Sequence, residues 1–131
     1  MEMKINFSGG TKVDAEYKGF KIKTDQPVDE GGEETAPEPF SLFLASIGTC
    51  TGVYVLSFCE RRKIPIDNIK LTLNFEKNPE TNLIEHMDIN IIVPNDFPAN
   101  YKNALIKTAG LCTVKKHLEK PPKIDINVIK K

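Results

Sequence analysis

The sequence predicts an α+β fold with the element order βββ-α-ββ-αα-β. Residues 3–23 and 69–93 alternate apolar and polar side chains, as expected for strands with one buried face. Between them, residues 39–59 carry no charge, which predicts a long apolar helix. No linker or internal repeat interrupts these 131 residues, so we expect a single domain over residues 1–131.

The first three strands are predicted to form an antiparallel meander. Met3, Ile5 and Phe7 share one face, and two glycine-containing turns then separate the alternating runs 12–17 and 20–23. The acidic, glycine-containing residues 25–36 predict a loop that moves.

The uncharged segment is predicted to be a helix from about residue 37 to residue 63. Pro37 and Pro39 suit a first helical turn, and Pro65 lies just beyond the end. Because the helix is apolar on every side, we expect it to be buried in a core or between two subunits. Its length would also allow a membrane span. Its small and hydroxyl residues, with amphipathic strands on both sides, favour a helix buried in protein and no membrane.

The second half of the chain predicts a hairpin, two short helices and a last strand. The hairpin comprises two alternating runs, 69–75 and 87–93. Asp96 and Pro98 predict the start of a helix that ends at Gly110. A second helix is expected over 112–120, and alternation at 124–128 predicts the final strand.

Composition excludes some partners and compartments. Eighteen basic and eighteen acidic residues cancel, which argues against nucleic acid, because phosphate binding needs an excess of basic residues on one face. Three cysteines do not form a secreted disulfide framework, and the first residues lack an apolar signal region. We therefore expect a cytoplasmic protein.

Two cysteines are candidates for chemistry. Cys50 lies in the apolar helix, where a thiol is either a buried structural residue or a reactive one. Cys112 is expected at the first turn of a helix, where free N–H groups and nearby Lys115 and Lys116 stabilise a thiolate. Cys59 lies nine residues after Cys50, on the opposite side of the helix, so we expect it to pack in the core.

The surroundings of Cys50 allow two interpretations. Phe43, Ile47 and Tyr54 lie near the Cys50 face of the helix, either as core packing or as an apolar pocket for a substrate. The cysteines and the two histidines lack the paired spacing of a zinc site, so we expect no metal and no cofactor.

Several motifs resemble the OsmC/Ohr family. They are Thr24-Asp25-Gln26-Pro27 through Gly31-Gly32, Pro37-Glu38-Pro39, the run from Leu42 to Gly48-Thr49-Cys50-Thr51, and Cys112-Thr113-Val114-Lys115. The resemblance covers essentially the whole chain. It implies an OsmC-like fold and an intertwined homodimer whose long central helices are buried between the subunits.

The resemblance also implies an activity, the reduction of organic hydroperoxides in oxidative-stress defence. Cys50 would attack the hydroperoxide and become a sulfenic acid, and Cys112 would resolve it as a disulfide. A dithiol reductant would then restore both thiols.

The chain departs from the family in the residues that activate the reactive cysteine. The best-characterised hydroperoxide reductases of the family pair that cysteine with an arginine of the N-terminal sheet and a glutamate ahead of the central helix, but here no arginine precedes Arg61. Glu38 lies close to the glutamate position, and Lys21 or a neighbouring lysine is a candidate for the cation, although lysine lacks the bidentate guanidinium. The alternative is a non-catalytic dimer of the same fold that binds a small molecule or senses redox state.

Overall fold

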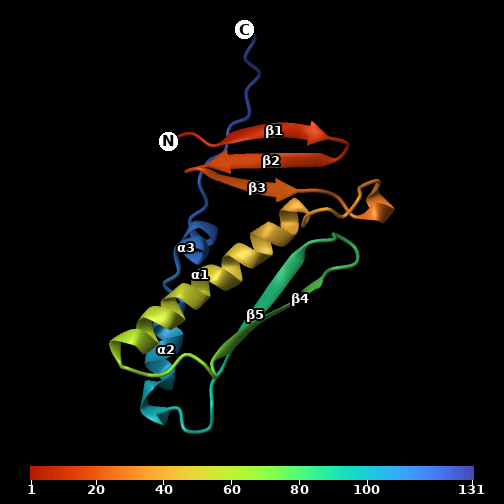
Figure 1. The fold of residues 1–131 in the computed structure, drawn as a ribbon. Helices are drawn as coiled ribbons and strands as arrows, with labels where there is room; N and C mark the ends of the chain where they lie inside the picture. Colours follow the sequence, from red (N-terminus) through yellow and green to blue (C-terminus); the bar gives the residue numbers. More distant parts are fainter. The chain divides into compact units, whose positions relative to one another are not determined.

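The computed structural model describes all residues, 1–131, in the order βββ-α-ββ-αα with two short 3-10 turns (Figure 1). The sheets are antiparallel, with three strands in the first and two in the second. The chain divides into two compact units, Met1–Ala45 and Ser46–Lys131.

The first unit contains the predicted meander. Strands β1 (Lys4–Gly9), β2 (Lys12–Tyr17) and β3 (Phe20–Thr24) pair in the order β1-β2-β3. The β1–β2 turn uses Gly10 at a φ of 55° and the β2–β3 turn uses Gly19 at 80°, values that glycine adopts without steric cost. Phe7 and Phe20 are exposed in the single chain, so the expectation of a half-buried sheet is not met at these positions.

Asp25 organises the loop after β3. Its carboxylate has no solvent exposure and accepts hydrogen bonds from the hydroxyls of Thr11 and Thr35 and from the N–H groups of Gln26 and Thr35. These bonds, the one from Thr11 foremost, hold the pKa of Asp25 well below its usual range. The loop that the sequence marks as mobile is therefore tied together around one buried charge.

The central helix α1 spans Pro39–Arg61, within two residues of the predicted limits. Its buried residues are Ile47, Thr51, Val55, Phe58 and Cys59, spaced as one stripe along the helix. Val53, on another face, is 60% exposed. Within the single chain α1 is thus buried along one stripe only, and its burial between two subunits stays a prediction.

The second unit contains the predicted hairpin, β4 (Lys70–Lys77) and β5 (Ile84–Ile92). The strands pair with Leu71 opposite Ile91 and Leu73 opposite Ile89. A 3-10 turn over Ala99–Tyr101 then leads into α2 (Lys102–Ala109), and α3 spans Thr113–Glu119. The expected cap at Asp96 is not found, because Pro98 occupies the cap position of the 3-10 turn.

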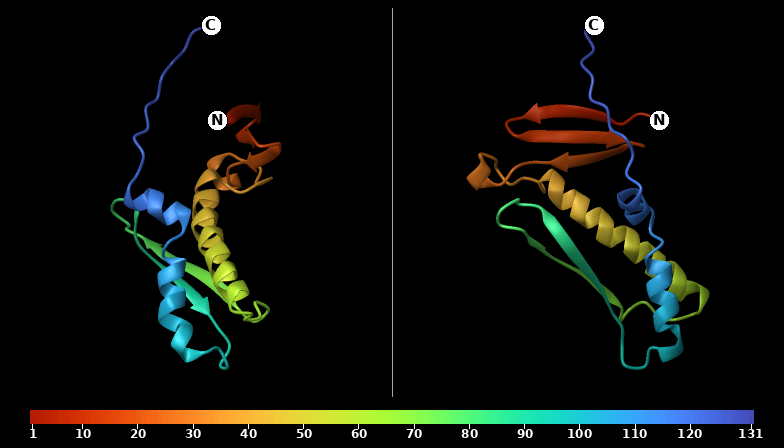
Figure 2. Two further views of the ribbon diagram at one scale, coloured as in Figure 1. Left: turned by 90° about the vertical axis from the view of Figure 1, so that its left-hand side faces the viewer. Right: turned by 180° about the vertical axis from the view of Figure 1, so that it is seen from behind.

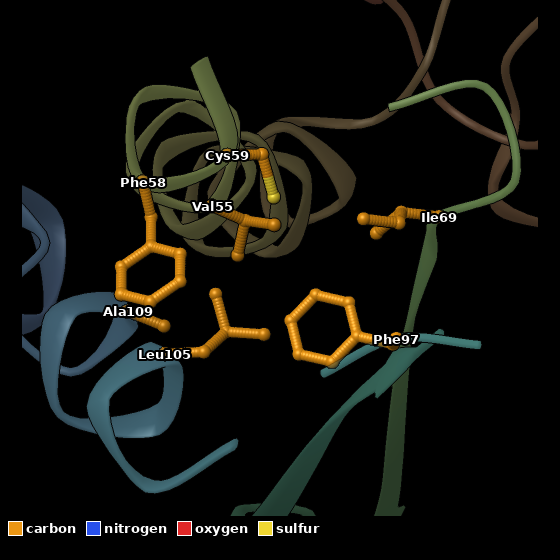
Figure 3. Close-up of a cluster of buried hydrophobic side chains, with 7 residues drawn as sticks. All are labelled: Val55, Phe58, Cys59, Ile69, Phe97, Leu105 and Ala109. Carbon is orange, nitrogen blue, oxygen red and sulfur yellow. The ribbon is translucent and has the colours of Figure 1, made fainter. Parts of the chain in front are cut away.

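The core of the second unit lies between α1, α2 and the residues around the hairpin (Figure 2). Val55, Phe58 and Cys59 of α1 meet Leu105 and Ala109 of α2, with Ile69 and Phe97 completing the cluster (Figure 3). Arg62 covers this core from outside, its guanidinium 3.5 Å from the centre of the Phe58 ring.

The last predicted strand is absent. Residues 121–131 have no regular secondary structure and run as an extended tail (Figures 1 and 2). Ile126 is 93% exposed, and Ile124 and Val128 are similarly uncovered. Alternation alone does not make a strand, because the backbone also needs a partner for its hydrogen bonds, and the tail has none in this chain.

By length and composition alone, α1 could cross a membrane. The core helix of a soluble protein passes the same test. The absence of a membrane partner therefore stays a prediction.

Candidate functional site

Cys50 lies at the edge of the buried stripe of α1. Ile47, Thr51 and Val55 form that stripe at intervals of four residues, and Cys50 precedes Thr51 by about 100° of helix rotation. This offset leaves Cys50 partly exposed, whereas Thr51 is buried. In the single chain, Cys50 is therefore more exposed than Cys112.

Cys112 lies at the start of α3, as the sequence predicts. Gly110 ends α2, and Cys112 then has extended backbone with φ −60° and ψ 143°, so it occupies the cap position of α3. Its Sγ accepts a hydrogen bond of 3.3 Å from the N–H of Lys115, one of the donors that a helix start leaves free. The whole residue has 0% exposure.

Side chains of α1 and α3 meet at this point. The Oγ1 of Thr51 donates to the Sγ of Cys112 at 3.7 Å, and the hydroxyls of Tyr54 and Thr113 lie 3.3 Å apart. Because Cys50 is covalently bonded to Thr51, the sulfur of Cys112 lies within about 10 Å of the Cα atom of Cys50. The structure thus brings the second cysteine against the residue that follows the first.

Thr51 is the residue of this site that sequence reasoning missed. It adjoins Cys50, but its partner Cys112 lies 61 positions away in the chain. No periodicity or motif spacing links two residues so far apart. The only signal was a hydroxyl at a position of the helix that faces the core.

Cys59 takes no part in this arrangement and packs in the core, as predicted. It is buried on the stripe that meets Leu105 and Phe97. Burial raises the pKa of the Cys59 thiol, with a smaller opposing effect from Arg62. All three cysteines are free thiols.

The remaining predicted site residues belong to α1 or to the first unit. Ile47 is buried, and its carbonyl accepts the hydroxyl of Thr51 at 2.8 Å. Phe43 stacks on Phe40 with ring centres 5.4 Å apart. Glu38 accepts the hydroxyl of Ser41 just ahead of α1, and Lys21 forms a loose, exposed ion pair with Glu16. Roles for these residues beside Cys50 stay predictions.

No group of three or more histidine, cysteine or acidic side chains is arranged to hold a metal ion. The chemistry that this arrangement offers is that of the two thiols. One is partly exposed on α1, and the other is buried at the start of α3, where the N–H of Lys115 donates to its sulfur and the hydroxyl of Thr51 lies 3.7 Å from it.

Comparison with known proteins gives matches of sequence and of fold. A model of the family described as OsmC-like protein matches residues 31–127. No curated protein matches the chain. A solved structure from Psychrobacter arcticus, provisionally described as an osmotic-stress-induced and detoxification-response protein, is 21% identical with a TM-score of 0.72; the match covers 87% of this chain and 85% of that one.

Two further solved structures share the fold. An organic hydroperoxide resistance protein, OsmC, from Legionella pneumophila is 19% identical with a TM-score of 0.55, over 89% of this chain and 87% of that one. An OsmC-like protein of unknown function from Vibrio cholerae is 11% identical with a TM-score of 0.64, over 90% and 92%. The family match spans well over half of the sequence, and the chain therefore belongs to the OsmC-like protein family.

Proposed function

We propose that the protein is a thiol-dependent reductase of organic hydroperoxides. The thiolate of Cys50 attacks the terminal oxygen of the hydroperoxide, the O–O bond breaks, and the alkoxide leaves and takes up a proton to become an alcohol. Cys50 is then a sulfenic acid. The thiolate of Cys112 attacks that sulfur to form the disulfide, and hydroxide leaves as water.

A dithiol reductant completes the cycle. Two successive thiol–disulfide exchanges transfer the bond to the reductant and return Cys50 and Cys112 as thiols. No cofactor is required, since the dithiol supplies both electrons. A cytoplasmic location, where thiols are kept reduced, agrees with this chemistry.

The observation that carries the proposal is the unequal exposure of two neighbouring cysteines. In the single chain, Cys50 is partly exposed, whereas Cys112 is fully buried against Thr51, the residue next to Cys50. A hydroperoxide from solution would therefore reach the first sulfur more readily than the second. This asymmetry matches an attacking cysteine and a resolving cysteine, and the description of the Legionella pneumophila protein of the same fold as an organic hydroperoxide resistance protein favours a hydroperoxide as the substrate.

The activating cation is proposed to be a lysine. Arg61 and Arg62 are the only arginines of the chain, and Arg62 is engaged with the rings of Phe58 and Tyr101. Lys21 is exposed and only loosely paired with Glu16 at 3.9 Å, so its ammonium is free to interact elsewhere. We assign it to the cation position and Glu38 to the acidic position ahead of α1. Phe43, Ile47 and Tyr54 would provide the apolar wall for the alkyl group.

The working form is proposed to be a homodimer. Val53 and Leu56 leave an apolar part of α1 exposed, and the tail exposes Ile124, Ile126, Val128 and Ile129. Exposed apolar surface on this scale marks an interaction site. Sedimentation is expected to give a dimer at micromolar concentration, and a stable, well-folded monomer would contradict this part of the proposal.

Thiol titration tests the reaction directly. Reduced protein is mixed with one equivalent of cumene hydroperoxide or of hydrogen peroxide, and free thiols and peroxide are counted over time. We expect two thiols to be lost per peroxide consumed, and faster with cumene hydroperoxide. Cys59→Ser is the matched control and should behave as wild type.

Two variants separate the roles of the cysteines. Cys50→Ser should consume no peroxide beyond the background rate of free cysteine. Cys112→Ser should consume about one equivalent and stop as a sulfenic acid that dimedone traps. If Cys112→Ser blocks the first oxidation and Cys50→Ser leaves it intact, the assigned roles are reversed.

The second candidate is a non-catalytic dimer that binds a small molecule or senses redox state. The absence of any arginine in the first 60 residues favours it, because an unassisted thiol reacts slowly with peroxide. This candidate predicts that no thiol of the protein reacts faster than free cysteine. The same titration therefore decides between the two functions.

A further inference from the structure

Thr51 is a buried polar residue that the proposed chemistry does not yet use. It is 4% exposed, and its hydroxyl oxygen lies 2.8 Å from the carbonyl of Ile47 and 3.7 Å from the sulfur of Cys112. A threonine inside a helix commonly bonds the carbonyl four residues earlier, so the first contact is ordinary. The second contact joins two helices at a cysteine and needs another explanation.

Packing alone does not account for a hydroxyl at this position. Valine has nearly the same shape as threonine and would fill the space without burying a polar group. The hydroxyl is instead positioned where it can interact with the sulfur in either of its protonation states. It has one proton to donate and two lone pairs that accept.

We propose that Thr51 is a positioning residue for Cys112 in the resolving step, an inference that rests on the proposed function. When Cys112 is a thiol, its S–H donates to the Oγ1 of Thr51 while the hydroxyl donates to the carbonyl of Ile47. When Cys112 is a thiolate, the hydroxyl of Thr51 turns to donate to the sulfur. The N–H of Lys115 donates to the same sulfur at 3.3 Å.

The contact acts on one step of the cycle only. In that step the thiolate of Cys112 attacks the sulfenic sulfur of Cys50, an S–S bond forms and the S–O bond breaks. The leaving hydroxide takes up a proton to become water, the sulfur of Cys50 is reduced, and that of Cys112 is oxidised. Thr51 holds the attacking sulfur beside the residue it must reach and does not touch the peroxide.

The experiment compares Thr51→Val, which keeps the shape and loses the hydroxyl, with Thr51→Ser, which keeps the hydroxyl. Thr108→Val removes a hydroxyl from α2 and is the matched control. Each reduced protein is mixed with one equivalent of cumene hydroperoxide. Dimedone-trapped Cys50 and the Cys50–Cys112 disulfide are then quantified by mass spectrometry over time.

We expect Thr51→Val to form the sulfenic acid at the wild-type rate and to close the disulfide about five-fold more slowly, the effect of losing one ordinary hydrogen bond. The dimedone-trapped fraction should rise accordingly. Thr51→Ser should restore the rate, and Thr108→Val should match wild type. Thr51→Ala serves as the second hydroxyl-free variant if the valine variant does not fold.

Two results would overturn the inference while leaving the proposed function intact. One is disulfide closure by Thr51→Val at the wild-type rate. The other is equally slow closure by Thr51→Ser, which would assign the effect to packing. A wild-type protein whose Cys50 is oxidised no faster than free cysteine would remove the proposed function, and this inference with it.

Discussion

Gly32 is predicted to be the least replaceable glycine of the chain. A Cβ atom at this position would lie 1.9 Å from the carbonyl oxygen of Gln26 and 2.4 Å from its carbon. Both are backbone atoms of the loop that Asp25 holds, so no side-chain rotation can relieve the overlap. Gly32→Ala must therefore open the loop.

The size of the effect follows from the hydrogen bonds that opening breaks. The N–H of Gly32 donates to Pro27 at 2.9 Å, and the N–H of Glu34 donates to Gln26 at 3.1 Å. At about 1 kcal/mol each, their loss should lower the free energy of unfolding by roughly 2 kcal/mol. The measurement is equilibrium urea denaturation, together with hydrogen exchange of the two amides.

Gly110→Ala is the matched control. Its added Cβ would meet only ordinary contacts of 3.5 Å or more, and its φ is −68°. It should change the free energy of unfolding by less than about 0.5 kcal/mol. The reasoning about the loop is refuted if Gly32→Ala is as stable as this control and its loop amides exchange at the wild-type rate.

Three further predictions concern stability and thiol reactivity. Asp25→Asn should destabilise the protein at pH 7. Because the pKa of Asp25 is lowered by folding, its contribution to the free energy of unfolding is present above the unfolded pKa of about 3.9 and fades as pH falls further. Urea denaturation should therefore show a smaller difference in stability between variant and wild type at pH 3 than at pH 7. Leu105 is 3% exposed, and Leu105→Ala should lower the free energy of unfolding by about 2–5 kcal/mol. Ile106 is 65% exposed, and Ile106→Ala should change it by less than about 0.5 kcal/mol. Equal effects of the two substitutions would contradict the assigned core. Cys59 is buried and its thiol pKa is raised, so it should react with a thiol reagent more slowly than Cys50 in the native protein. Faster labelling of Cys59 than of Cys50 in a mass-spectrometric time course would contradict its place in the core.

Local patterns predicted most of the elements correctly. Alternation gave the meander and the hairpin, and the prolines around the uncharged segment placed α1 within two residues at each end. The start of α3 at Cys112 also followed from local signals, since Gly110 ends the preceding helix. Each of these features depends on residues close together in the chain.

Features that depend on distant residues could not be predicted. The acidic run 25–36 looks like a solvated loop, and nothing in it singles out Asp25 as the charge that Thr11 and Thr35 bind. The contact of Thr51 with Cys112 arises only when two helices pack. The candidate cysteines themselves came from residue type and from resemblance to a family, whose activating arginine this chain lacks.

Two differences between the predicted pattern and the single chain share one physical explanation. An apolar helix predicts cover on all sides, yet α1 buries only one stripe and leaves Val53 exposed; alternation at 124–128 predicts a strand, yet the tail is extended and uncovered. Within this chain, α1 is without cover on one face and the tail pairs with no strand. In the proposed homodimer, a second copy of the chain would supply apolar cover for α1 and a strand edge for the tail at once. The same patterns that misled the single-chain prediction are therefore the strongest grounds, within this sequence, for the proposed homodimer.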